Sequence, residues 1–588
     1  MNVPRQGGSI RALLTQPHML LTALKVKLAA MVAVAGIDTA DMTNPSPDLT
    51  KVLDALAADQ AAAQKAATDK TAGPDVNKSF NEALAKINEL AKKGDKDAQY
   101  ALAHWGVLSN SNVSDIIDLY RKASGQGQVL AKVELAQVLL KAFPQDQERA
   151  KEAVQLIQEA EKADNKVARR LLANLYLAGA PNVGVEQSVE KAKSLLEQGS
   201  AAGDGEATLG LSQLYAAGVT GLAKDEQKSL DYLIKATEQK NAVAMSTYAA
   251  RLFDGDPTTA DSKALVKKDP TKAMAMFEDA ANAGFAAANR LLGAIYENGL
   301  GGNAKNLKKA VEYYSKAANG NDAQALFRLG NFFEAGVSEG EGDKAVAIVQ
   351  QNAKSALDLY RLAAQNGSSE AFYNVGVYYE TGTVVDKDPI KAFAFLLKAA
   401  TSGVPQAQFR LAGLYQQGSG TSQDVVAALA WFDRAASAGF APAQIALGQM
   451  FESGAGLGRA NPAAAATQYE AAAEAGVPLA MLRLASLNER GLTNIKDNTA
   501  VPNMARALAY ADLAVDASNK AEQAVQYRDA LKAKMKAEDI AEAKKIYDSK
   551  KKSDSAAPAA PAAAAPAAPA ATAPAPKSKG SSKKSGGN

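Results

Sequence analysis

The side chains that most often carry out catalysis are scarce in this sequence. It contains two histidines, His18 and His104, and no cysteine among 588 residues. Histidine is the usual acid–base group near neutral pH, while cysteine supplies nucleophilic thiolates, disulfides and metal ligands. Asp386 and Asp388 form a candidate carboxylate pair, but they directly precede an expected helix, whose N-terminal dipole acidic side chains complement. We therefore predict no enzyme activity, no cofactor and no metal site.

The composition favours closely packed helices. Hydrophobic residues make up 47% of the chain but aromatic residues only 6%, and alanine dominates, which favours helix pairs over sheets. The net charge is +3, and the positive charge is concentrated in residues 549–588, where seven lysines accompany one aspartate. The remaining chain is close to neutral, so we predict no specific nucleic-acid partner.

Residues 1–50 are a leader with two open interpretations. Arg5 and Arg11 precede an apolar stretch from Met19 to Ile37, in which Ala33-Val34-Ala35 resembles a cleavage site. That order is typical of a secretory signal, so export to the periplasm or medium is slightly favoured over a cytoplasmic location. The alternative is an N-terminal helix or an unfolded leader, because the apolar core is short. No stretch reaches the ~20 uninterrupted apolar residues of a membrane span, so we predict no transmembrane helix.

Residues 549–588 are predicted to be a disordered tail. Residues 555–576 are almost wholly Ala and Pro, and residues 577–588 are mostly Lys, Ser and Gly. Proline interrupts helices, and such small side chains cannot build a core. The tail is either a solubilising arm or an arm whose basic tip contacts an anionic polymer.

An internal repeat occupies most of the chain. Its first half has Ala, then Leu or Val four residues later, a small residue next, an aromatic residue three later and a Gly three after that. Four plain copies cover residues 288–299, 371–382, 407–418 and 443–454. A second half follows each copy, and across the array the glycines that close second halves lie at 284, 320, 367, 403, 439 and 476. The recurring period of about 36 residues, with apolar residues at i, i+4 and i+8, predicts stacked helix pairs.

Weaker copies extend the array toward the N-terminus and predict eleven two-helix units within residues 95–518. Residues 51–94 are expected to supply capping helices before the array, and residues 519–548 one long charged helix that caps its other end. The predicted first helices begin near Ala98, Ala131, Ala168, Ala207, Ala244, Ala288, Ala325, Ala371, Ala407, Ala443 and Ala480.

The order of residues in the unit resembles the Sel1-like repeat, a relative of the tetratricopeptide repeat. The first half reads Ala-x-x-x-Leu-Gly-x-x-Tyr-x-x-Gly, and the second Lys-Ala-x-x-x-[Tyr/Leu]-x-x-Ala-Ala-x-x-Gly. The first two units depart from it at His104-Trp105 and Phe143-Pro144. The resemblance implies an all-α fold, a right-handed α/α superhelical solenoid that acts as an adaptor or scaffold. It also implies that bacterial members are often exported and that some serve the cell envelope.

Four polar residues each stand just before the core Leu or Val of a first helix. Stacked repeats would align them along the concave surface, where arginine can grip carboxylates. The alternative is that each arginine covers apolar surface with its stem and keeps its charged head in water. These candidate binding residues are Arg328, Asn374, Arg410 and Arg483.

Three insertions break the period, at residues 255–268, 337–354 and 492–502. Insertions in repeat proteins usually form loops on one face, which is often the binding face. We expect the insertion at 337–354 to contribute to partner specificity and its residues 346–354 to add one or two helical turns.

These features predict a non-enzymatic scaffold that binds proteins or peptides on a concave helical surface. The alternative is an exported envelope factor that binds polysaccharide or peptidoglycan.

Overall fold

The computed structural model describes residues 46–556, apart from 70–74, 110, 257–264, 340–345, 494 and 497–498. Most of the predicted leader and the tail from residue 557 onward therefore lie outside the described residues. The described chain is almost wholly helical, and its strands form two short antiparallel hairpins. Within these ranges, no helix combines the length and hydrophobicity needed to cross a bilayer.

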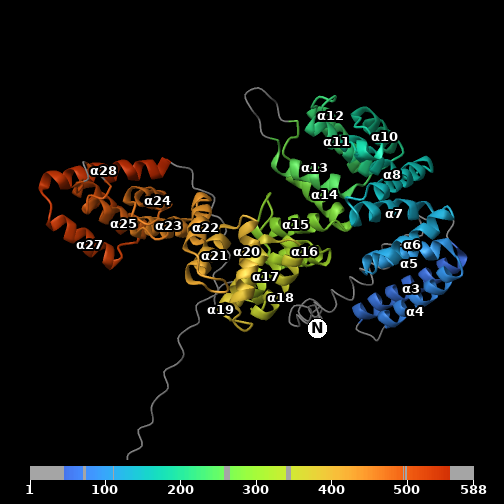
Figure 1. Cartoon of the computed structure of the whole chain (residues 1–588), viewed down its shortest axis with the longest axis horizontal. Helices are drawn as coiled ribbons and strands as arrows, with labels where there is room; N and C mark the ends of the chain where they lie inside the picture. Colours follow the sequence, from blue (N-terminus) through green and yellow to red (C-terminus); the bar gives the residue numbers. More distant parts are fainter. Residues whose placement is uncertain are drawn as a thin grey trace, which may run out of the picture. The chain divides into compact units, whose positions relative to one another are not determined.

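The chain divides into two compact units, residues 1–322 and 323–588, and each is a row of antiparallel helices (Figure 1). The helices of unit 1 are α3 (Pro47–Asp69), α4 (Val76–Lys92), α5 (Lys96–Leu108), α6 (Val113–Gly125), α7 (Val129–Ala142), α8 (Gln147–Lys162), α9 (Lys166–Ala178), α10 (Val189–Ala201), α11 (Gly205–Ala217), α12 (Glu226–Glu238), α13 (Ala242–Asp254), α14 (Pro270–Asn282), α15 (Ala286–Asn298) and α16 (Leu307–Asn319).

Unit 2 continues the same pattern and adds two hairpins. Its elements are α17 (Ala323–Ala335), β1 (Val337–Glu339), β2 (Val346–Val349), α18 (Ala353–Gln365), α19 (Ser369–Thr381), α20 (Pro389–Thr401), α21 (Pro405–Gln417), α22 (Val425–Ser437), α23 (Ala441–Ser453), α24 (Pro462–Glu474), α25 (Pro478–Glu489), β3 (Ile495–Lys496), β4 (Thr499–Ala500), α26 (Met504–Ala517), α27 (Glu522–Ala533) and α28 (Ala537–Ala556).

Eleven consecutive helix pairs, from α5–α6 to α25–α26, confirm the predicted repeat solenoid in the described chain. The local signals at the helix ends explain the register. Asp388 and Asn461 accept hydrogen bonds from the backbone amides three residues later, which caps α20 and α24 at their N-termini. Gly382 and Gly418 take the left-handed conformation that ends α19 and α21.

Small residues let the two helices of a pair approach closely. A Cβ added at Gly330 would lie 2.5 Å from the ring of Tyr360, and one added at Gly448 would lie 2.5 Å from the ring of Tyr469. Both tyrosines are fully buried. The aromatic ring of the second helix thus lies directly on the backbone of the first, which explains the small residue after each core Leu.

Buried amides join consecutive pairs. Gln408 Nε2 donates to the carbonyl oxygen of Ala400 at 3.2 Å, and Gln444 Nε2 donates to that of Ala436 at 3.3 Å. Each bond runs from a first helix to the last turn of the preceding second helix, where carbonyls lack partners within the helix. These bonds fix the stacking of one repeat on the next.

The insertion at 337–354 corrects one prediction. Residues 346–349 form strand β2, which pairs with β1, and helix starts only at Ala353, after the cap Asn352. The expected helical turns at 346–354 are therefore wrong. The run Val346-Ala-Ile-Val349 is rich in β-branched residues, which favour the extended backbone once a partner strand is available.

The predicted single capping helix over 519–548 is also wrong, because it is two helices, α27 and α28. The break after Ala533 lets α28 fold back along α26. There Ala543 is buried, and Ile540 packs in the same apolar cluster as Leu508 of α26. A straight helix would leave this apolar face in water. Helix α28 also continues to Ala556, inside the predicted tail.

Candidate functional site

All four candidate binding residues lie in unit 2, at corresponding positions of first helices. Arg328 lies on α17, Asn374 on α19, Arg410 on α21 and Arg483 on α25. Helix α23 carries Ala446 at this position, so the predicted ladder is interrupted. The three arginines are half-buried, whereas Asn374 is buried.

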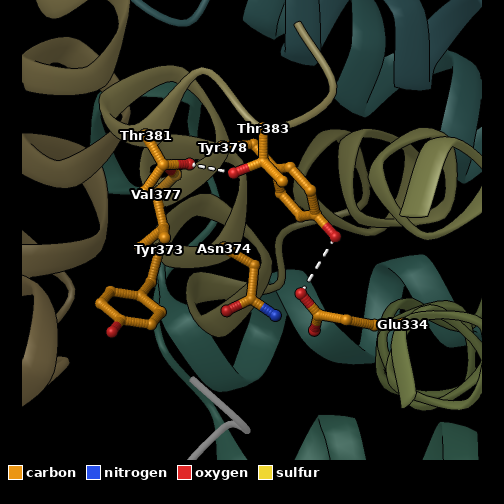
Figure 2. Close-up of a pocket in the computed structure, with 7 residues that line it drawn as sticks. All are labelled: Glu334, Tyr373, Asn374, Val377, Tyr378, Thr381 and Thr383. Carbon is orange, nitrogen blue, oxygen red and sulfur yellow. Dashed lines mark hydrogen bonds between the residues drawn. The ribbon is translucent and has the colours of Figure 1, made fainter. Parts of the chain in front are cut away.

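Asn374 lines a small pocket between α17 and α19 (Figure 2). The pocket has a volume of about 10 Å³, which is room for about one water molecule. Tyr378 Oη donates to Glu334 Oε1 at 3.0 Å on its wall. Asn374 Nδ2 is buried. A partner would meet Asn374 only through this pocket, and not on an open surface.

Arg410 is held between two neighbouring helices. Its Nη1 donates to Glu380 Oε2 at 2.8 Å, and its Nε donates to the hydroxyl of Tyr373 at 3.2 Å. Both partners belong to α19, so the guanidinium joins α21 to the preceding repeat. About a third of the Arg410 side chain stays exposed (31%).

Glu380 lies in a repeat that lacks the tyrosine found at this place in other repeats. In other repeats the glutamate at this position accepts a hydrogen bond from a buried tyrosine of the second helix. This occurs for Tyr314 with Glu297 at 2.7 Å and for Tyr469 with Glu452 at 3.1 Å. In the pair α19–α20 that tyrosine is replaced by Leu396, which packs against Gly376. The Glu380 carboxylate pairs with Arg410 of the next repeat.

Arg410 borders an open groove of about 450 Å³, which we call the α21 groove. Its walls combine half-buried aromatic rings with polar groups. The Phe409 ring lies 5.5 Å from the rings of both Phe432 and Phe440, measured between centroids. The residues that line the groove include Tyr373, Glu380, Phe409, Arg410, Gly413, Gln416, Gln417 and Phe440.

Sequence reasoning found Arg410 but missed the rest of this groove. Gly413 is the most informative omission, because a Cβ added there would meet no atom within 4 Å. A helical glycine that packs against nothing lowers helix stability without a packing benefit, so its effect is to leave the groove open. The available signals were Gly413 itself and Leu396 in place of the repeat tyrosine.

Unit 1 contains a buried titratable cluster around Glu134 of α7. Its carboxylate accepts hydrogen bonds from Tyr100 at 2.8 Å, from His104 Nδ1 at 2.7 Å and from Tyr120. Burial raises the pKa of Glu134, but the bond from His104 and those from the tyrosines outweigh it and hold the pKa below its ordinary value. Burial, together with Glu134, raises the pKa of Tyr120. Three donors occupy the carboxylate, which makes it a structural centre of α5, α6 and α7. His18, the other histidine, lies outside the described residues.

We expect acid to destabilise unit 1 through Glu134. A carboxylate with a lowered folded-state pKa adds stability that is complete above its ordinary value of 4.5 and is lost as the pH falls through the lower folded-state pKa. Urea denaturation midpoints should therefore fall more steeply below about pH 4.5 in the wild type than in Glu134→Gln. Equal slopes for the two proteins would contradict this assignment.

The repeat geometry agrees with a comparison against known families. The Sel1 repeat model matches residues 166–204, 205–241, 259–285, 286–322, 323–368, 369–404, 405–440, 441–477 and 478–519. The chain belongs to the Sel1 repeat family. The matches begin at residue 166, so they do not include α5–α8, where the sequence departs from the repeat pattern.

Two solved structures are similar to this Sel1 repeat protein. It is similar to c5321, a protective antigen of uropathogenic Escherichia coli strains, with 22% identity, a TM-score of 0.52 and coverage of 80% of this chain and 94% of that one. That likeness shows a shared fold. A Sel1 repeat protein of Oxalobacter formigenes is 30% identical, with a TM-score of 0.37 and coverage of 45% and 96%.

One curated relative comes from Saccharomyces cerevisiae. The chitin synthase regulator SKT5 is 30% identical over 159 residues, which is 27% of this chain. The chain spans 22% of the length of that relative.

Proposed function

We propose that this Sel1 repeat protein is a non-enzymatic scaffold whose α21 groove binds an extended peptide segment of a partner protein. The observation that carries the proposal is an open groove lined by half-buried aromatic rings on consecutive repeats. Pockets that mix apolar walls with a few placed polar groups are typical binding sites. Membership of a repeat family typical of adaptors supports the same function.

The polar groups of the groove suit an extended backbone. The side chains of Gln416 and Gln417 are exposed and offer both donors and acceptors. The Tyr373 oxygen accepts from Arg410, so its O–H can donate to a peptide carbonyl. Arg410 is already paired with Glu380, so the groove presents a neutral ion pair and does not select for net charge.

Filling the groove should weaken peptide binding without disturbing the fold. Gly413→Gln places a side chain in open space on a helix, where it also improves helix propensity. Peptides selected from a displayed random library on the wild-type chain should bind Gly413→Gln at least about tenfold more weakly, a loss of about 1.4 kcal/mol. Fluorescence anisotropy with labelled peptides measures the change.

Gly125→Gln is the matched control. Gly125 ends α6 in unit 1, is exposed, and also has no atom within 4 Å of an added Cβ. This variant should bind the selected peptides as the wild type does. Peptides that bind both variants equally would contradict the proposal. Binding of polysaccharide or peptidoglycan fragments that Gly413→Gln abolishes, without any peptide binding, would favour the envelope-factor alternative instead.

A further inference from the structure

We infer that the α21 groove also binds the chain's own Ala/Pro segment, residues 557–576, which therefore competes with partner peptides. The inference rests on the proposed function, because it names a second occupant of the same groove. Three observations carry it: the proline spacing of the segment, the lining of the groove, and the place where α28 ends.

The proline spacing suits a groove lined by aromatic rings. Pro558 and Pro561 are three residues apart, and so are Pro566 and Pro569. A polyproline II helix has three residues per turn, so the prolines of each pair lie on the same edge. Two such prolines pack between aromatic rings in the general mode by which proline-rich segments are recognised.

The groove offers the matching chemistry. Tyr373, Phe409 and Phe440 present half-buried rings along its walls. A polyproline II backbone has no internal hydrogen bonds, so its carbonyls need donors from the groove or from water. The Tyr373 hydroxyl and the exposed Gln416 amide can supply them. The alanines between the prolines are small enough to avoid clashes with the groove walls.

The end of α28 lies close enough to the α21 groove for the segment that follows it to reach the groove. Lys551 Nζ contacts Asp516 of α26 at 2.7 Å, and the Lys550 ammonium lies 5.1 Å from the centroid of the Tyr510 ring. Tyr510 in turn donates to Glu470 of α24 at 3.2 Å. Helix α24 packs on α23, whose Ala446 lines the groove.

The length of the segment exceeds the span that it must cross. Packed helices lie about 8–10 Å apart, so the groove is a few such layers from the end of α28. Twenty residues of polyproline II extend about 60 Å. Because the segment is tethered to the same unit, its effective concentration at the groove is in the millimolar range, and even weak binding competes with a partner.

The first test measures the segment as a separate peptide. The receptor is the full chain in which Pro558, Pro561, Pro566, Pro569, Pro574 and Pro576 are replaced by serine, so that its own segment does not compete. A fluorescent peptide of residues 556–579 should bind it saturably. Adding Gly413→Gln to the receptor should weaken binding at least about tenfold, and adding Gly125→Gln should leave it unchanged.

A matched peptide separates proline recognition from charge. The same peptide with its six prolines replaced by serine keeps Lys577 and Lys579. It should bind at least about tenfold more weakly than the proline peptide. Equal binding of the two peptides, or equal binding to the Gly413→Gln and Gly125→Gln receptors, would overturn the inference.

The second test measures competition within the full chain. A library peptide that occupies the groove should bind the proline-to-serine chain about tenfold more tightly than the wild type. Equal affinities would overturn the inference while leaving the proposed function intact, because the library peptide would still require an open groove. If no library peptide binds Gly413→Gln more weakly than the wild type, the proposed function is overturned instead.

Discussion

Replacing Glu134 with leucine is expected to lower the free energy of unfolding of unit 1 by about 3–5 kcal/mol. The substitution removes the shared acceptor of three side chains, Tyr100, Tyr120 and His104. The two tyrosines are at least 97% buried, which limits the access of water to their hydroxyls once the acceptor is lost. Leaving one buried donor unpaired costs about 1–3 kcal/mol of folding free energy. This is more than the net stability that one satisfied hydrogen bond adds.

A rescue variant tests that mechanism. Tyr100→Phe and Tyr120→Phe remove the hydroxyls that Glu134→Leu leaves unpaired, so the triple variant should recover a large part of the lost stability. Urea denaturation measures the stability lost in Glu134→Leu and regained in the triple variant. Hydrogen exchange of the amides in α5, α6 and α7 then assigns both changes to unit 1. A triple variant that is less stable than Glu134→Leu alone would contradict the assignment of the cost to unpaired hydroxyls.

Gly448→Ala is expected to destabilise unit 2 by about 1–3 kcal/mol, although alanine is the better helix former. The added Cβ would lie 2.5 Å from the ring of Tyr469. That ring is fully buried, and its hydroxyl is bound to Glu452 at 3.1 Å, so it has little room to move away. The helix pair α23–α24 must separate slightly to accept the methyl group.

Gly413→Ala gives a comparison in the adjacent repeat, one residue after Ala412, which is the residue that corresponds to Gly448. Its Cβ meets nothing within 4 Å, so only the backbone effect remains, and stability should rise by about 0.5–1 kcal/mol. Urea denaturation midpoints of the two variants should therefore move in opposite directions from the wild type. Shifts of the same sign would contradict the packing role of the repeat glycine.

The sequence by itself determined the repeat architecture. The spacing of about 36 residues, the caps such as Asp388 and the terminal glycines such as Gly382 act within one or two helical turns, so they can be read without tertiary information. The core positions follow from the same period, because the alanine and leucine of each unit face the neighbouring helices. The scarcity of histidine and cysteine likewise needed no structure.

Only the tertiary structure decided the site and the ends of the array. Arg410 was a candidate from its repeat position, but its partners Glu380 and Tyr373 lie on α19 of the preceding repeat and were not predicted. Asn374 shares that repeat position yet is buried. The strands at 337–339 and 346–349 and the break between α27 and α28 both depend on contacts with another segment of the chain. Strand β2 needs β1 as its hydrogen-bonding partner, and α28 buries Ala543 against α26; local periodicity specifies neither neighbour.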